Sequence, residues 1–371
     1  MPAFINSLAD IPLFQRVCLY GLGEGCYHFL QLVKEHRADI EIVSLIDDSK
    51  TVSSTPFKVT RPECLENDKF DMILVTSAYW VAICRKLDSL SIRSYMVVNP
   101  YLLYEHVIMT DAESVAWHDS FNRTCELLGS SEQQELYQLV VGSRSIQPDM
   151  QQNLYDYYQA HQNPKTEYLE FINLSHFTTI IEGGVFDGAN TAVFAGEARG
   201  SGCIYGFEPN LDAVVDRRLS SISADAAVIK LYSLALWSHR AVLSFYKNSQ
   251  NLPGARIVSE SSELPELAEV QAISIDEFVA ENNVQKVDYI KLDVEGAELD
   301  VINGAVNTLQ RDRPQLAICI YHRKEHLFSI PLYLDSILTG YHYYIGHYSP
   351  TFWDTVWYAV PKELARDSIL K

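Results

Sequence analysis

Twice along this chain, a short apolar segment runs into a glycine-rich turn that opens a helix. The first copy is Arg16–Tyr20 followed by a turn over 21–25, and the second is Thr178–Glu182 followed by a turn over 183–188. Apolar segments and helical spacing alternate after each turn, the pattern of a parallel sheet with helices on its faces. We therefore predict two α/β units, for which 371 residues leave ample room.

The alternation divides the chain into three parts. Residues 1–110 form the first α/β unit, and residues 176–371 form the second. Between them, over 111–175, apolar residues recur three and four positions apart, which predicts a helical connector.

Within the second unit the spacing predicts individual elements. We expect a helix over Asp212–Ser220, one strand over Ala227–Leu236, and a strand-like insertion over 241–270. The last two strands, Tyr341–Gly346 and Thr355–Val360, are too close in sequence for a parallel crossover, so they must form an antiparallel hairpin.

The charge of the chain limits its partners. There are 29 Lys and Arg against 48 Asp and Glu, a formal charge of −19, which would repel nucleic acid and anionic membranes. We expect a neutral or zwitterionic small-molecule substrate. The 7 cysteines are odd in number and lack a C-x-x-C pair, and no leader or membrane-spanning segment is evident. These features predict a cytoplasmic protein.

The second glycine turn has the residues of a nucleoside site. Gly184 and Gly188 let the backbone approach a ligand, and Glu208, which ends the next strand, can accept hydrogen bonds from a ribose. The acids in this turn would oppose a pyrophosphate but favour the sulfonium and ammonium groups of S-adenosylmethionine. The predicted cofactor-binding residues are Glu182, Gly184, Asp187, Gly188, Asn190, Thr191, Glu208, Pro209 and Asn210.

A third group of residues follows the apolar strand at 287–292. Acids and imidazoles here meet at the carboxyl edge of the predicted sheet, where they could remove a hydroxyl proton. They could equally coordinate a divalent metal ion, with Asp293 and His322 as possible ligands. The predicted catalytic residues are Asp293, Glu295 and His322, and the predicted substrate-binding residues are Glu298, Tyr321 and His347.

The segment Ile290-Lys-Leu-Asp-Val-Glu-Gly-Ala-Glu298 resembles the signature of FkbM-type S-adenosylmethionine-dependent methyltransferases. The turn at 181–191, Phe207-Glu-Pro209 and Cys319-Ile-Tyr-His322 are similar to the same family, and the resemblance covers residues 176–361. It implies a class I methyltransferase sheet and O-methylation of a hydroxyl on a sugar, glycan or secondary metabolite. Glu182 stands where the family commonly has Asp.

The first glycine turn leaves an alternative open. Gly21-Leu-Gly-Glu-Gly25 is an incomplete dinucleotide fingerprint, and Asp47 or Asp48 could hold a ribose. The region resembles the Rossmann-like domains that precede some FkbM-type methyltransferases. It could have a structural role or form the interface of a homodimer. The rival functions are an NAD(P)- or nucleotide-sugar-binding oxidoreductase or epimerase, and a catalytically inactive binding module.

Overall fold

The computed structural model describes most of the chain, and its described residues form two compact units. The first comprises 1–117, 139–162 and 349–352, and the second comprises 118–138, 163–348 and 353–371. The described residues are 2–51, 53, 55–65, 69–161, 167–198, 202–211, 215, 218–219, 226–246, 256–257 and 267–365.

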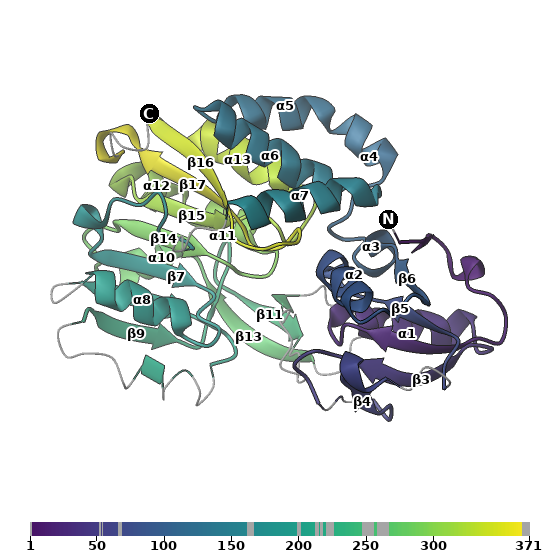
Figure 1. The fold of residues 1–371 in the computed structure, drawn as a ribbon. Helices are drawn as coiled ribbons and strands as arrows, with labels where there is room; N and C mark the ends of the chain where they lie inside the picture. The colour runs from purple at the N-terminus through teal and green to yellow at the C-terminus, as the bar shows by residue number, and fades with distance from the viewer. Residues whose placement is uncertain are drawn as a thin grey trace. The chain divides into compact units, whose positions relative to one another are not determined.

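The first unit is built on a six-stranded parallel sheet with the order β1-β6-β5-β2-β3-β4 (Figure 1). Its strands are β1 (Phe4–Ile5), β2 (Arg16–Tyr20), β3 (Glu41–Ile46), β4 (Val59–Thr60), β5 (Met72–Val75) and β6 (Tyr95–Val98). Its helices are α1 (Glu24–His36), α2 (Trp80–Ser89), α3 (Pro100–Leu103), α4 (Asp111–Ala116) and α7 (Pro148–Ala160). Buried residues of β2, β5 and α2 form its core, around Trp80.

The second unit is built on a seven-stranded sheet with the order β16-β17-β15-β14-β7-β8-β9. Strand β17 runs in the opposite direction to the other six strands of this sheet. It pairs antiparallel with β16, so the predicted hairpin is confirmed. The strands are β7 (Thr179–Gly183), β8 (Cys203–Phe207), β9 (Val228–Tyr232), β14 (Tyr289–Leu292), β15 (Gln315–Cys319), β16 (Tyr341–His347) and β17 (Thr355–Pro361).

Helices pack against this sheet, and a buried cluster around Phe177, Phe194 and Tyr289 fills one side of it. The helices are α5 (His118–Glu126), α8 (Ala189–Ala198), α10 (Ile275–Glu281), α11 (Glu298–Asn303), α12 (Val306–Asp312) and α13 (His326–Ile337), while α6 (Ser131–Ser143) contributes to both units. Short 3₁₀ turns lie at Leu8–Asp10, Pro62–Cys64, Leu174–His176 and Lys362–Leu364. No helix in the described ranges is long and apolar enough to cross a lipid bilayer.

The insertion forms a small separate sheet with the order β10-β13-β11-β12. Its strands are β10 (Ala235–Leu236), β11 (Ala241–Tyr246), β12 (Arg256–Ile257) and β13 (Leu267–Ile273). The prediction of one strand over 227–236 is therefore wrong. Two strands form here instead of one. Strand β9 ends at Tyr232 and pairs with β8, whereas the buried residues Ala235 and Leu236 form β10 and pair with β13. Of the predicted helix over 212–220, all but 215, 218 and 219 lie outside the described residues.

Candidate active site

The order of the seven strands reverses between β7 and β14. From β7 the sheet continues through β8 to β9 on one side, whereas from β14 it continues through β15 on the other. In open α/β sheets a ligand crevice forms where the strand order reverses in this way, outside the carboxyl ends of the strands. The turns that follow these two strands, residues 183–188 (the β7 turn) and residues 293–298 (the β14 turn), therefore define the candidate site.

The two turns touch at Gly184. Gly184 has φ +82°, and a Cβ placed on it would lie 1.9 Å from the carbonyl oxygen of Asp293. Only glycine fits this position. The buried ammonium group of Lys291, on β14, donates to the carbonyl oxygens of Gly184 (2.6 Å) and Gly183 (3.3 Å). The β7 turn is thus held against the end of β14.

Glu182, the last residue but one of β7, has a fully buried carboxyl group. Its Oε2 accepts a hydrogen bond from Thr191 (2.7 Å), whereas the buried Oε1 has no hydrogen-bond partner among the described residues. Burial raises the pKa of Glu182 to about 7, although Lys291 and Thr191 act in the opposite direction. A buried acceptor without a partner is costly, so this oxygen is ready to accept a donor group from a ligand.

Glu208 follows β8 on the other side of the β7 turn. Its Oε2 accepts the backbone N–H of Phe186 (3.2 Å) and its Oε1 accepts that of Asn210 (2.9 Å), which fixes the carboxylate beside the turn. Phe186 has φ +50° and a ring that is 66% exposed, an unusual conformation for a bulky side chain. Asp187 caps Ala189 at the start of α8 and forms an ion pair with Arg218 (3.0 Å).

Asp293 follows β14 and is held by two tyrosine hydroxyls. Tyr168 donates to Oδ2 (2.9 Å) and Tyr321 donates to Oδ1 (3.1 Å). Burial would raise the pKa of Asp293, but the charges of Lys291 and His322 outweigh it and hold the pKa below its usual value. The side chain remains 24% exposed, so a fixed carboxylate reaches the crevice.

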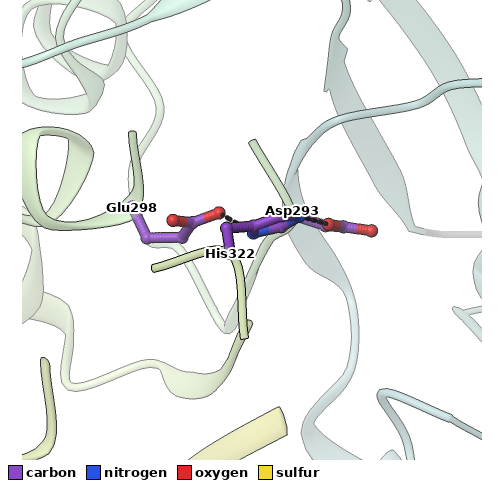
Figure 2. Close-up of side chains that lie close together, drawn as sticks. All are labelled: Asp293, Glu298 and His322. Carbon is purple, nitrogen blue, oxygen red and sulfur yellow. Dashed lines mark ion pairs between the residues drawn. The ribbon is translucent and has the colours of Figure 1, made fainter. Parts of the chain in front are cut away.

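His322 lies between Glu298 and Asp293, as Figure 2 shows. Its Nδ1 is 2.8 Å from Oε1 of Glu298, and its Nε2 is 3.4 Å from Oδ1 of Asp293 and 3.5 Å from Oε2 of Glu295. Burial alone would lower the pKa of His322, but the surrounding carboxylates raise it to about 9. In this state the imidazole carries a proton at neutral pH and balances part of the negative charge.

Glu298 is the buried support of this cluster. Its Oε1 accepts the backbone N–H groups of Val294 (3.0 Å) and Gly296 (3.3 Å), and its Oε2 lies 3.2 Å from Nδ1 of His326. Burial opposes ionisation, but His322 and His326 keep the pKa of Glu298 well below its usual value. The carboxylate is inaccessible to solvent, which suits a support better than a substrate contact.

The β14 turn exposes Glu295 through a strained backbone. Glu295 has φ +54°, in the left-handed region that a side chain rarely adopts, and Gly296 follows with φ +95°. Its side chain is 32% exposed.

Asp293, Glu298 and His322 each offer one ligand atom to a metal ion, all within 4.8 Å of one another.

The structure thus brings together most of the predicted catalytic and substrate-binding residues, while their roles stay predictions. Asp293, Glu295, Glu298, Tyr321 and His322 form one cluster. His347 lies on the outer strand β16, where its Nδ1 is 2.9 Å from Thr355.

Sequence reasoning assigned no role to several residues of the site. Lys291 is buried within an otherwise apolar strand, a signal that could have been read. His326 follows His322 by four positions and shares Glu298 with it. Tyr168 and Glu167 come from the connector and carried no signal. Burial, reinforced by Asp354 and Asp293, raises the pKa of Glu167 to about 7.

In the first unit, Gly25, in the first turn of α1 after the β2 glycine turn, packs closely against the protein itself. A Cβ on Gly25 would lie 2.4 Å from the Tyr104 hydroxyl oxygen and 2.8 Å from the Thr76 carbonyl oxygen. Asp47 accepts the backbone N–H groups of Leu22, Ser49 and Lys50. Gly25 and Asp47 thus have close contacts within the unit, and a nucleotide-binding role of this turn stays a prediction.

Comparisons with known proteins agree with this geometry. A sheet with one antiparallel strand and a crevice at the β7 and β14 turns defines a class I methyltransferase-type fold. Residues 182–343 match the family model for the methyltransferase FkbM domain, and residues 13–98 match the model described as C2185-like, N-terminal. The match over residues 182–343 confirms the resemblance to FkbM-type methyltransferases stated from the sequence.

Two relatives extend the comparison. The hexuronic acid methyltransferase AglP of Haloferax volcanii is 34% identical over 108 residues, which cover 29% of this chain and 43% of AglP, so the match spans less than half of that relative. The crystal structure of methyltransferase FkbM from Methylobacillus flagellatus KT is 18% identical, with a TM-score of 0.63. It covers 95% of this chain and 92% of that structure, which confirms the α/β fold.

Proposed function

We propose that the protein is an S-adenosylmethionine-dependent O-methyltransferase acting on a hydroxyl of a sugar, glycan or secondary metabolite. The FkbM domain supports the reaction class, and the name of AglP supports a carbohydrate acceptor. The observation that carries the proposal is the contact at Gly184, which joins a nucleoside-type glycine turn to the backbone of Asp293, the residue that also presents the site's carboxylate.

The residues of the β7 turn fit the donor. The partnerless Oε1 of Glu182 suits the donor's ammonium group, and Glu208, fixed by two backbone N–H groups, suits the ribose hydroxyls. Gly184 lets the β7 turn lie directly against the backbone of Asp293. When bound, S-adenosylmethionine supplies an electrophilic methyl group that leaves a sulfonium sulfur for the acceptor oxygen.

The residues of the β14 turn fit the acceptor. Asp293 can accept a hydrogen bond from the attacking hydroxyl and thereby orient its lone pair. A hydroxyl proton becomes strongly acidic as its oxygen gains the methyl group, so even a carboxylate of low pKa can take it at that stage. His322 is already protonated in this state, so Asp293 is the better proton acceptor.

Substitution of Asp293 tests this assignment. Asp293→Ala should abolish methyl transfer from labelled donor to a host extract and leave donor affinity nearly unchanged in calorimetry. Loss of donor affinity would instead move Asp293 into the donor site, and unchanged transfer would remove it from the chemistry. The cytoplasmic location and the homodimer stay predictions.

A further inference from the structure

We propose that the β14 turn and His322 bind a divalent metal ion of the Mg²⁺ or Mn²⁺ type through Asp293, Glu295 and His322. The ion's part in methyl transfer rests on the proposed function, but its binding can be tested independently of that function.

The first argument is the position of the His322 imidazole. The side chain is 7% exposed, and the buried Nε2 makes no hydrogen bond with any described residue. Nε2 instead faces Asp293 at 3.4 Å and Glu295 at 3.5 Å. These separations exceed the range of about 2.7–3.2 Å for an N–H···O hydrogen bond. They are close to the roughly 3.0–3.4 Å between neighbouring ligands that share one ion at about 2.1 Å.

The second argument is the support behind these atoms. A histidine that binds a metal ion commonly has a carboxylate beside its other ring nitrogen, and Nδ1 of His322 lies at an ion-pair distance of 2.8 Å from Glu298, outside hydrogen-bond geometry (Figure 2). The hydroxyls of Tyr168 and Tyr321 orient Asp293 in the same way. Glu298 lies near enough to be counted among the ligands. Its oxygens already contact two backbone N–H groups and two imidazoles, so we assign it to the support.

The third argument is the composition and accessibility of the site. Two carboxylates and one imidazole form an oxygen-rich set that suits Mg²⁺ or Mn²⁺ better than a thiolate-preferring ion. The Asp293 and Glu295 side chains are 24% and 32% exposed, which leaves positions for water and for an acceptor hydroxyl. An ion bound here would displace the proton from Nε2 of His322 into solvent and would polarise that hydroxyl, while Oδ2 of Asp293, on the Tyr168 side, would still be able to take the hydroxyl proton.

The test is a titration of the chelator-treated full-length protein with Mn²⁺, followed by calorimetry and by electron paramagnetic resonance of the bound ion. We expect one saturable Mn²⁺ per chain. Affinity should fall at least tenfold in Asp293→Asn and in His322→Gln, and by less in Glu298→Gln. Glu295→Gln lies on an exposed turn and gives a third ligand variant, which keeps the buried cluster intact. His342→Gln, on β16 and outside the cluster, is the matched control and should bind Mn²⁺ as the wild type does.

Absence of saturable Mn²⁺ binding by the folded wild type, or equal binding in all the variants, would overturn the metal site. A second arm separates this result from the proposed function. Donor binding should persist in excess EDTA, while methyl transfer should fall at least a hundredfold and return with Mn²⁺ or Mg²⁺. Full transfer in EDTA would reject the metal ion and leave the methyltransferase intact, whereas failure to bind donor under any condition would reject the methyltransferase.

Discussion

The ammonium group of Lys291 lies 2.6 Å from the carbonyl oxygen of Gly184 and 3.8 Å from the carboxylate of Asp293. A single buried side chain therefore links the turn assigned to the methyl donor with the carboxylate assigned to the acceptor.

Lys291→Met should destabilise the second unit. It removes the buried counter-charge of Asp293 and a donor to the β7 turn, and breaking a buried ion pair from one side costs about 3–5 kcal/mol. Thermal and urea unfolding would measure the loss. Arg240→Met is a control on an exposed ion pair with Glu281 in the same unit and should cost under about 1 kcal/mol. Equal losses in the two variants would contradict the link.

Gly184→Ala should be among the most damaging single-methyl changes in the chain. The new Cβ would meet the Asp293 carbonyl oxygen at 1.9 Å in a backbone conformation of φ +82°, so the two turns must separate. We expect a loss of about 3 kcal/mol or more. Gly196→Ala, on α8 with no heavy atom within 4 Å, should be neutral or stabilising by up to about 1 kcal/mol. Similar stabilities of the two variants would refute the contact.

Much of the second unit follows from its sequence. Apolar strands ending at Glu182 and Asp293 determine both turns, and parallel strands bring their carboxyl ends to one edge. The split between β9 and β10 was missed, because pairing with β13 depends on a partner more than 30 positions away. Tyr168 was missed for the same reason, since its hydroxyl reaches Asp293 across 125 positions.

Donor affinity should depend on pH through Glu182. Burial gives this acid a pKa of about 7 against 4.5 for an unburied glutamate, and Lys291, Asp293 and Glu208 are the charged groups that act on it. A donor ammonium prefers the carboxylate form, so affinity should rise about tenfold between pH 6 and pH 8. Calorimetry with Glu182→Gln, where no proton is gained or lost, should show a flatter profile. A flat wild-type profile would argue against the contact.

The same group makes a prediction for stability. Because the folded state binds a proton more tightly than the unfolded state, stability from this group is greatest below pH 4.5 and falls as the pH rises to about 7. The free energy of unfolding should be about 3 kcal/mol lower above pH 7 than below pH 4.5, because the pKa differs by about 2.5 between the folded and unfolded states. Urea unfolding at several pH values should show that Glu182→Gln removes this part of the pH dependence of the free energy of unfolding. An unchanged pH dependence in the variant would mean that another group is responsible for it.

The two hydroxyl groups that donate to Asp293, those of Tyr168 and Tyr321 (the tyrosine clamp), should affect turnover more than donor binding. Tyr168→Phe and Tyr321→Phe each remove one hydrogen bond to the charged carboxylate, worth about 1.5–3 kcal/mol, so kcat should fall roughly 10- to 100-fold. Tyr341→Phe removes a hydroxyl that donates to the Pro314 carbonyl and should leave kcat unchanged. An unchanged kcat in both clamp variants would mean that Asp293 needs no such positioning.

Calorimetric titration of the wild-type protein with S-adenosylmethionine, repeated with Glu208→Gln, tests the central claim most directly. We predict one donor per chain, at least a tenfold loss of affinity in Glu208→Gln, and no binding of NAD in the same cell. Binding of NAD but not of S-adenosylmethionine, or a donor affinity indifferent to Glu208, would contradict the assignment of the β7 turn to the methyl donor.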